Sequence, residues 1–287
     1  MKAWVKRGAA LQLQEVSRPA AASNELLVRV AACSLNRGEI RAVQRAADGA
    51  IPGWDVAGTV IAAAANGKGP KAGARVCALV NSGGWGEVVA VPASHAAVVP
   101  DGVELDVAAT LPIAGLTVVR ALGVAGSLVG KRMLITGASG GVGQFAIQLG
   151  AMAGAAVTAV RDLVASTEDG PYDFILESVG GPSFAAAIER VARGGVVVTI
   201  GNSSEQETTF NARTLYAKGG ASIYGLLIFE ELDSLRVTAA DLERLLRLVE
   251  SGKLQSPIAM RRPWKELPEA LHELEQRSFR GKAVVVH

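Results

Sequence analysis

Gly137-Ala138-Ser139-Gly140-Gly141-Val142-Gly143 is the stretch of this chain that decides its fold. It follows an apolar run at residues 133–136, which predicts a buried strand, and it precedes residues 144–149, whose apolar spacing predicts the start of a helix. Strand, glycine-rich turn and helix in this order indicate a dinucleotide-binding unit. Glycines let the backbone approach a pyrophosphate closely, and the N–H groups at a helix start attract its negative charge.

Strands and helices continue to alternate beyond this turn. We expect strands at residues 155–160, 172–176, 196–200 and 221–225, and helices at 183–193 and 239–251. This alternation predicts an α/β fold with a doubly wound parallel sheet. Residues 162–171 are too few for a further strand and helix, because one βαβ unit needs about 30 residues. We therefore expect the sheet to lack one edge-strand unit and this linker to cross the sheet either nearly extended or as a very short helix.

The part of the chain before residue 100 is rich in predicted strands. They lie at residues 25–35, 58–61, 74–80, 88–91 and 96–99, with Gly and Pro between them. Short helices are expected at 106–111 and 115–124, interrupted at Pro112, and a helix at 264–276 precedes a strand at 282–286. Short strands at this spacing predict a barrel or sandwich separate from the parallel sheet.

Charge and hydropathy exclude several classes of partner. The formal net charge of the 287 residues is +2, and the Lys and Arg residues are scattered, so neither nucleic acid nor an anionic membrane is an expected partner. The first residues contain no apolar signal segment, and no run of apolar residues is long enough to span a membrane. We expect a cytoplasmic protein with a small-molecule substrate.

Metal ligands are scarce. The chain has two cysteines, Cys33 and Cys77, and three histidines, His95, His272 and His287, none of them at ligand spacing from another. A tetrahedral zinc site needs three or four such ligands. We expect no protein-bound metal.

The chain resembles the zinc-independent branch of the medium-chain dehydrogenase/reductase superfamily, the quinone-oxidoreductase-like enzymes. The resemblance covers almost the whole chain and rests on residues 34–36, 52–58, 111–117, 137–143, 177–181 and 281–286. It implies a GroES-like β-barrel domain at residues 1–115, completed by 256–287, and a Rossmann domain at 116–255. It also implies NADPH-dependent reduction of quinones or α,β-unsaturated carbonyl compounds, and a homodimer formed through the strand at 221–225.

The chain also departs from this family's relatives. In the zinc alcohol dehydrogenases a Cys would stand at Asn36 and a His at Trp54, and both are absent here. Some quinone reductases have a Tyr near the position of Arg41, whereas this chain has no Tyr before residue 172. The short linker at 162–171 departs from the family as well and affects the adenine side of the cofactor site.

Arg161 stands where the second strand of the parallel sheet should end. A basic residue there favours the 2′-phosphate of NADPH, whereas an acidic one favours NAD. Asp162 follows Arg161 directly and makes this assignment less clear. The alternative interpretation is that Arg161 is a solvated arginine at a strand end. The residues predicted to contact the cofactor are Gly137, Ser139, Gly140, Gly141, Val142, Gly143, Arg161, Gly201 and Leu227. The apolar stretch around Leu227 covers the nicotinamide or, alternatively, forms a core or subunit contact.

Three residues are candidates for the catalytic site. Asn36 faces the nicotinamide or the substrate carbonyl, or else is a turn residue bonded to its own backbone. The resemblance places Thr117 near the nicotinamide, and a capping or packing role is its alternative. Trp54 either walls the substrate cleft or fills the domain junction. The nearby carboxylates Asp55 and Glu39 are expected at the cleft or in salt bridges with arginines.

The expected chemistry is hydride transfer by positioning, without a zinc ion or an obvious acid near Asn36. The developing oxyanion would be met by backbone N–H groups, Asn36 or water. This suits quinones and enones, which are already activated. A tailoring reductase of specialised metabolism and a non-catalytic nucleotide-sensing or scaffold protein are the alternatives, because a fold does not determine a function.

Overall fold

The computed structural model describes residues 1–235 and 238–287, which form two compact units by their contacts. Unit 1 consists of Met1–Leu116 and Leu232–His287, and unit 2 consists of Thr117–Glu231. The sequence placed residues 232–255 in the second domain. Their helix α8 (Thr238–Glu250) instead packs in unit 1 against strand β7 (Ala96–Val98).

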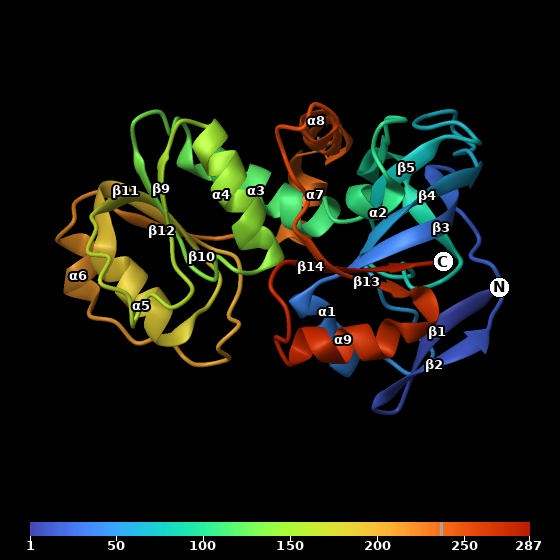
Figure 1. Ribbon diagram of the computed structural model, residues 1–287, viewed down its shortest axis with the longest axis horizontal. Coiled ribbons are helices and arrows are strands. Elements are labelled where there is room, and N and C mark those ends of the chain that lie inside the picture. Colours follow the sequence, from blue (N-terminus) through green and yellow to red (C-terminus); the bar gives the residue numbers. More distant parts are fainter. Residues whose placement is uncertain (236–237) are drawn as a thin grey trace. The chain divides into compact units, whose positions relative to one another are not determined.

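Unit 2 is built around a five-stranded parallel sheet (Figure 1). Its strands are β8 (Arg132–Ile135), β9 (Ala156–Ala159), β10 (Tyr172–Glu177), β11 (Val191–Thr199) and β12 (Ser222–Gly225). Their order is β12-β11-β10-β8-β9, and every neighbouring pair is parallel. This confirms the predicted doubly wound parallel sheet, and it places β12 at an open edge.

The strand order determines on which face of the sheet the helices α4 (Gly141–Met152) and α5 (Gly181–Arg190) of unit 2 lie. The other helices of unit 2 are α3 (Pro112–Ala125), which begins in unit 1, α6 (Ala212–Tyr216) and α7 (Ile228–Leu235), which begins in unit 2 and ends in unit 1. The chain moves one way along the sheet from β8 to β9 and the other way from β10 to β11. Because such crossovers are right-handed, α4 and α5 lie on opposite faces of the sheet (Figure 1). The topological switch point therefore lies between β8 and β10, at the carboxyl ends of these two strands.

The sheet lacks one edge unit, as the linker length predicted. β9 has β8 as its neighbour at the end of the sheet, and the chain returns past β8 to β10 without a strand or helix in residues 160–171. Leu163 anchors this linker. Its side chain is fully buried in an apolar cluster with Leu134, Tyr172 and Ile175. One buried leucine thus holds the crossing segment against the sheet.

Two predicted helices differ from the structure. The helix expected at 183–193 ends at Arg190, because the β-branched Val191 starts strand β11 and is fully buried. Pro112 does not interrupt a helix but begins α3. A proline at the first helical position loses nothing, since its N–H would have no helical partner there.

Unit 1 contains a seven-stranded sheet in which all pairs are antiparallel except β13 with β14. Its strands are β3 (Glu25–Leu35), β4 (Asp55–Ala62), β5 (Arg75–Leu79), β6 (Val88–Pro92), β7, β13 (Ile258–Pro263) and β14 (Lys282–Val286). A separate hairpin, β1 (Lys2–Arg7) with β2 (Ala10–Glu15), and the helices α1 (Arg37–Arg45), α2 (Leu105–Ala108) and α9 (Leu267–Glu275) complete the unit. The sequence had not predicted the hairpin, α1 or β13.

Candidate functional site

The glycine turn lies at the switch point, between the end of β8 and the start of α4. Gly137 has a φ of 59°, and a Cβ there would lie 2.4 Å from Ser178 Oγ. A Cβ on Gly143 would lie 2.7 Å from Ala138 Cα. The fold itself therefore requires both glycines. Gly140 differs, because its φ is −81° and the nearest atom to a Cβ would be 3.5 Å away.

The first N–H groups of α4 are available to a ligand. Gly140 N–H donates to Gly137 O at 3.0 Å, and Gln144 N–H donates to Gly140 O at 2.9 Å. Among the residues that the structure describes, no acceptor is found for the N–H groups of the three residues between, 141–143. These groups and the positive end of the helix dipole have the geometry that suits an anion.

The other predicted cofactor residues lie around the same sheet edge of unit 2. Ala138 N–H donates to Val160 O at 3.2 Å, which brings the exposed Arg161 beside the turn. Gly201 is exposed, and a Cβ on it would lie 3.5 Å from Ser178 O. Leu227 is 57% exposed and follows the end of β12. The structure thus brings Arg161 and Gly201 toward the turn, while Leu227 follows the edge strand.

Sequence reasoning missed Glu177 as a site residue. It ends β10, and its side chain is fully buried. Its Oε1 accepts hydrogen bonds from Thr136 Oγ1 (3.2 Å), Val179 N (2.9 Å), Gly180 N (3.1 Å) and Ser183 Oγ (3.1 Å), and its Oε2 accepts one from Gly180 N (3.0 Å). Burial raises the pKa of Glu177, and these hydrogen bonds oppose the rise. A carboxylate directly after a buried strand and before two glycines was the available signal.

An open hollow of about 500 Å³ lies beside the shortened linker in unit 2. It is lined by Val164, Pro182, Ala185, Ala186, Glu189, Arg190, Glu207 and Thr209. Val164 of the linker is 59% exposed and faces this hollow. The side of α5 next to the linker is therefore incompletely covered.

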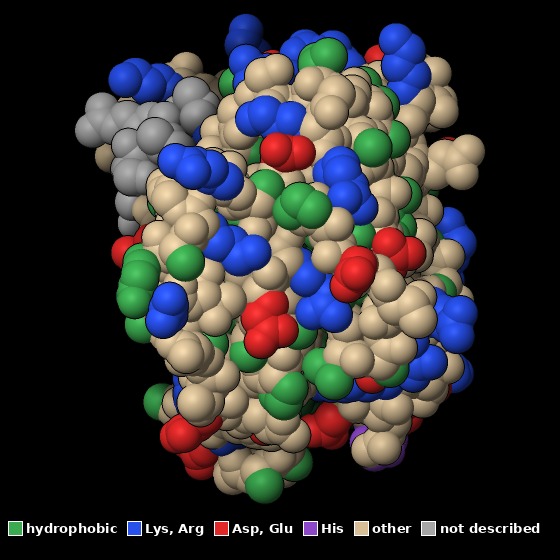
Figure 2. Space-filling model, turned by 90° about the vertical axis from the view of Figure 1, so that its left-hand side faces the viewer, with side chains coloured by type: hydrophobic (Ala, Val, Ile, Leu, Met, Phe, Trp, Pro, Cys, Tyr) green, Lys and Arg blue, Asp and Glu red, His purple; other side chains and the backbone are tan. Residues whose placement is uncertain are grey.

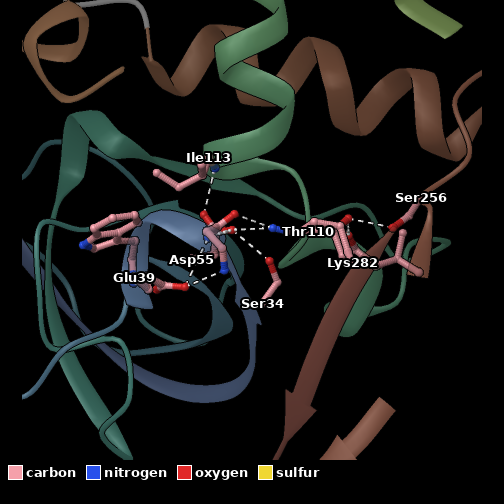
Figure 3. A network of polar contacts seen from close by, with 10 residues as sticks. Ser34, Glu39, Asp55, Thr110, Ile113, Ser256 and Lys282 are labelled. Carbon is pink, nitrogen blue, oxygen red and sulfur yellow. Dashed lines mark hydrogen bonds and ion pairs between the residues drawn. The ribbon is translucent and has the colours of Figure 1, made fainter. Parts of the chain in front are cut away.

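A second polar cluster lies in unit 1, around Asp55 at the start of β4 (Figure 3). Asp55 Oδ1 accepts a hydrogen bond from Ile113 N–H at 2.8 Å, at the start of α3. Its Oδ2 accepts from Ser34 Oγ (2.8 Å), Asn36 Nδ2 (2.8 Å) and Lys282 Nζ (3.3 Å). The Asp55 and Lys282 side chains are 0% and 3% exposed, so this is a buried ion pair, and further hydrogen bonds support both of its members.

Asn36 takes part in this cluster through its whole side-chain amide. Lys282 Nζ donates to Asn36 Oδ1 at 2.6 Å. Asn36 Nδ2 donates to Asp55 and more weakly, at 3.5 Å, to Glu39 Oε2. Both amide hydrogens therefore point at carboxyl groups, and a substrate oxygen would compete with the oxygens of Asp55 and Glu39 for them.

Glu39 connects Asn36 with Trp54. Its Oε2 accepts from Asn36 N–H at 2.7 Å and its Oε1 accepts from Trp54 N–H at 2.8 Å. Glu39 is fully buried, and burial, followed by the nearby Asp55, raises its pKa from 4.5 to about 8. The two backbone hydrogen bonds and Lys282 act in the opposite direction. The structure thus brings two of the three predicted catalytic residues together on one carboxyl group.

The surroundings of the other candidates are also defined. Trp54 is half-buried, and its ring lies so close to Gly38 that a Cβ there would be 2.8 Å from the ring. Thr117, the third candidate, lies in α3 in unit 2 and is 6% exposed.

Cys33 and Cys77 are buried, and burial raises the pKa of both thiols, which disfavours metal-binding thiolates. The described residues contain no group of three or more His, Cys, Asp or Glu that could hold a metal ion.

Helix length and surface charge in the described part of the chain relate to membranes and polyanions as partners. Within residues 1–235 and 238–287, no helix combines the length and apolar character needed to cross a membrane. Figure 2 shows Lys and Arg side chains interspersed with Asp and Glu on one face, without a continuous block of either sign. A face of mixed sign does not form the one-signed field that attracts a polyanion.

Comparisons with known proteins agree with this geometry. A family model described as "Zinc-binding dehydrogenase" matches residues 149–285, and one described as "Alcohol dehydrogenase GroES-like domain" matches residues 22–101. The chain is 28% identical to "Chloroplast envelope quinone oxidoreductase homolog" of Arabidopsis thaliana, over 96% of this chain and 94% of that protein. It is 29% identical to a mitochondrial NAD(P)H oxidoreductase of Bos taurus, over 81% of this chain and 69% of that protein.

The solved structures extend the match to the whole fold. An alcohol dehydrogenase superfamily protein from Novosphingobium aromaticivorans is similar with a TM-score of 0.88 and 25% identity, covering 100% of this chain and 99% of that one. The predicted combination of a GroES-like domain and a Rossmann domain is therefore confirmed. The chain belongs to the quinone-oxidoreductase-like family of medium-chain dehydrogenases/reductases, whose members are NAD(P)-dependent oxidoreductases.

Proposed function

We propose that this protein is a zinc-independent, NADPH-dependent reductase that transfers hydride to quinones or α,β-unsaturated carbonyl compounds. The observation that carries the proposal is the glycine turn at the switch point of unit 2. Residues 141–143 offer N–H groups without a protein acceptor in the described chain, and the open side of Gly140 leaves room for a phosphate to approach. These features fit the pyrophosphate of a dinucleotide.

NADPH is proposed over NADH because of Arg161. Arg161 is exposed and lies two residues after β9, at the strand end where the adenosine ribose of a dinucleotide is bound. The hollow whose lining includes Val164 and Pro182 is a candidate place for the adenine. Since the linker that borders this hollow is short and Val164 is largely exposed, we expect the adenine to remain partly open to solvent.

A reduced nicotinamide, when bound, supplies the hydride. The residues of the chain contribute binding and orientation: the turn at 137–143 holds the pyrophosphate, and the buried cluster around Asp55 fixes Asn36 and Trp54 for the substrate. Because the Asn36 amide hydrogens are directed at the carboxyl groups of Asp55 and Glu39, backbone N–H groups or water are proposed to stabilise the oxyanion. Conjugated quinones and enones need no stronger activation.

Zinc independence is proposed from the side chains at positions 36 and 54, where the zinc alcohol dehydrogenases would have metal ligands. Asn36 and Trp54 are poor zinc ligands. Asn36 is moreover held by Lys282, whose positive charge in contact with its oxygen disfavours a cation there. The cluster therefore fits an ammonium group in place of a metal ion.

A homodimer is proposed from the open edge of unit 2. Strand β12 has its outer edge unpaired in the described sheet, and its Ile223 and Tyr224 are each 36% exposed. Tyr216 of α6 is 71% exposed nearby in the chain. An edge strand with apolar side chains favours pairing with a second copy across a two-fold axis.

NADPH oxidation with a panel of quinones and enones tests the activity. Turnover is expected with at least one conjugated acceptor and not with simple alcohols and NADP. Arg161→Ala should weaken NADPH binding by about tenfold or more and leave NADH unchanged, since the 2′-phosphate contact is lost. Lys131→Ala, which removes a positive charge before β8, is the matched control. Tight NADPH binding without turnover of any acceptor would favour the non-catalytic, nucleotide-sensing alternative.

A further inference from the structure

Two glycine-containing turns meet at the switch point of unit 2. One follows β8 and leads into α4, and the other follows β10 and leads into α5. In the second turn Gly180 and Gly181 have φ values of 78° and 53°, so the backbone curls and directs N–H groups inward. Such a nest of N–H groups before a helix is a place for an anion. The sequence alone therefore offers two places for one pyrophosphate.

The second turn already contains an anion, the carboxylate of Glu177. It accepts the N–H groups of Val179 and Gly180 and the Ser183 hydroxyl, all at 3.1 Å or less. We propose that Glu177 is a specificity-determining residue for the cofactor, because its carboxylate fills the α5 nest and confines the pyrophosphate to the glycine turn before α4. This inference rests on the proposed function of that turn.

The same carboxylate is joined to the glycine turn by short contacts. Glu177 Oε1 accepts from Thr136 Oγ1, and Thr136 directly precedes Gly137. Ser178 N–H donates to Thr136 Oγ1 at 3.0 Å, and Ser178 Oγ donates to Thr136 O at 3.2 Å. The built-in anion is thus fixed within a few bonds of the place proposed for the ligand anion. Because the Glu177 carboxylate occupies the α5 nest, its negative charge repels a second anion from that nest.

Two substitutions separate charge from shape. In Glu177→Gln the amide oxygen can keep the four hydrogen bonds that Oε1 accepts. The charge is lost, and an NH2 group that cannot accept from Gly180 N–H takes the place of Oε2. Glu177→Ala removes the carboxylate and uncovers the N–H groups of Val179 and Gly180. Glu243→Gln is the control, since Glu243 is an exposed carboxylate on α8 in unit 1.

The probe is inorganic pyrophosphate, titrated into isotope-labelled protein and followed by the backbone amide resonances. In the wild type, the amides of residues 141–143 should respond, and those of Val179 and Gly180 should not. In Glu177→Ala the amides of Val179 and Gly180 should respond as well. Glu177→Gln should bind pyrophosphate and NADPH about tenfold more tightly, because a like charge has been removed. Glu243→Gln should leave both affinities unchanged.

Three results would overturn the proposal. They are a response of Val179 and Gly180 in the wild type, no response of these amides in Glu177→Ala, and weaker binding by Glu177→Gln in parallel with a lower Tm, which a purely structural residue would cause. If Glu177→Ala does not fold, Glu177→Gln decides. A wild type that binds neither NADPH nor pyrophosphate would refute the proposed function, while the response of Val179 and Gly180 in Glu177→Ala would still decide the role of Glu177.

Discussion

Replacing Glu39 by Gln should change how the stability of unit 1 depends on pH. Glu39 is fully buried, and its two carboxyl oxygens accept the backbone N–H groups of Asn36 and Trp54. The charged groups acting on it are Asp55, which raises its pKa, and Lys282, which lowers it. Gln has the same shape but carries no charge at any pH, so the substitution isolates the ionisation.

The size of the effect follows from the pKa of Glu39, which burial and Asp55 raise from 4.5 to about 8. Between these values the folded protein holds a proton that the unfolded chain has released, so the free energy of unfolding falls as pH rises. The stabilisation is complete below about pH 4.5 and lost above about pH 8, with a ceiling of about 5 kcal/mol at about 1.4 kcal/mol per pH unit. Gln accepts only one of the two N–H groups, which costs about 1–3 kcal/mol independently of pH.

The assay is urea unfolding followed by tryptophan fluorescence at about pH 5.5 and about pH 8.5, the window in which Glu39 titrates. Trp4, Trp54, Trp85 and Trp264 all lie in unit 1, so the fluorescence reports on that unit. The wild type should lose up to about 3 kcal/mol more than Glu39→Gln between these pH values. Glu243→Gln should behave like the wild type. A difference between wild type and Glu39→Gln that stays the same at both pH values would show that Glu39 is ionised throughout, and would refute the reasoning.

Three further predictions concern the cofactor turn, the metal and the assembly. Gly140→Ala should weaken NADPH binding about tenfold or more without changing Tm, because its Cβ meets no protein atom closer than 3.5 Å, whereas Gly143→Ala should lower Tm because its Cβ would lie 2.7 Å from Ala138 Cα. Unchanged NADPH affinity in Gly140→Ala, measured by calorimetry, would mean that the phosphates do not approach this residue. Dialysis against a strong chelator should leave NADPH oxidation intact, and stoichiometric zinc in elemental analysis with loss of turnover on its removal would contradict the proposal. Light scattering at micromolar concentration should give a dimer for the wild type and a monomer for Ile223→Lys, which puts a charge on the exposed β12 edge; a monomeric wild type would contradict the edge pairing.

The fold could be predicted from the sequence where a short, continuous stretch of residues determines the element. The bounds of β3 and β14 agree with the strands predicted at 25–35 and 282–286, since both are apolar runs. The missing edge unit followed from chain length alone. Helix α1 was not predicted, because its nine residues are mostly polar and its stability depends on Glu39 bonding back to Asn36 and on packing against α9.

The candidate site divides in the same way. The glycine turn is a continuous stretch, so its place before α4 could be predicted from sequence. The roles of Glu177 and Lys282 could not, although both stand in motifs that carried the family resemblance. Lys282 meets Asn36 across 246 positions of the chain, and Glu177 meets Thr136 across 41. Such partners are chosen by tertiary structure, which no local pattern contains.

The buried cluster in unit 1 also sets an order for folding during synthesis. Strand β14 lies between β3 and β13, so the sheet that begins at residue 25 cannot be completed until residues 282–286 have left the ribosome. Until then Asp55 and Asn36 lack Lys282. Unit 2 is one continuous stretch, Thr117–Glu231, and depends on no later strand. We expect the nascent chain to close its parallel sheet first, while the part translated earliest stays incomplete until the strand that carries Lys282 arrives to pair with Asp55.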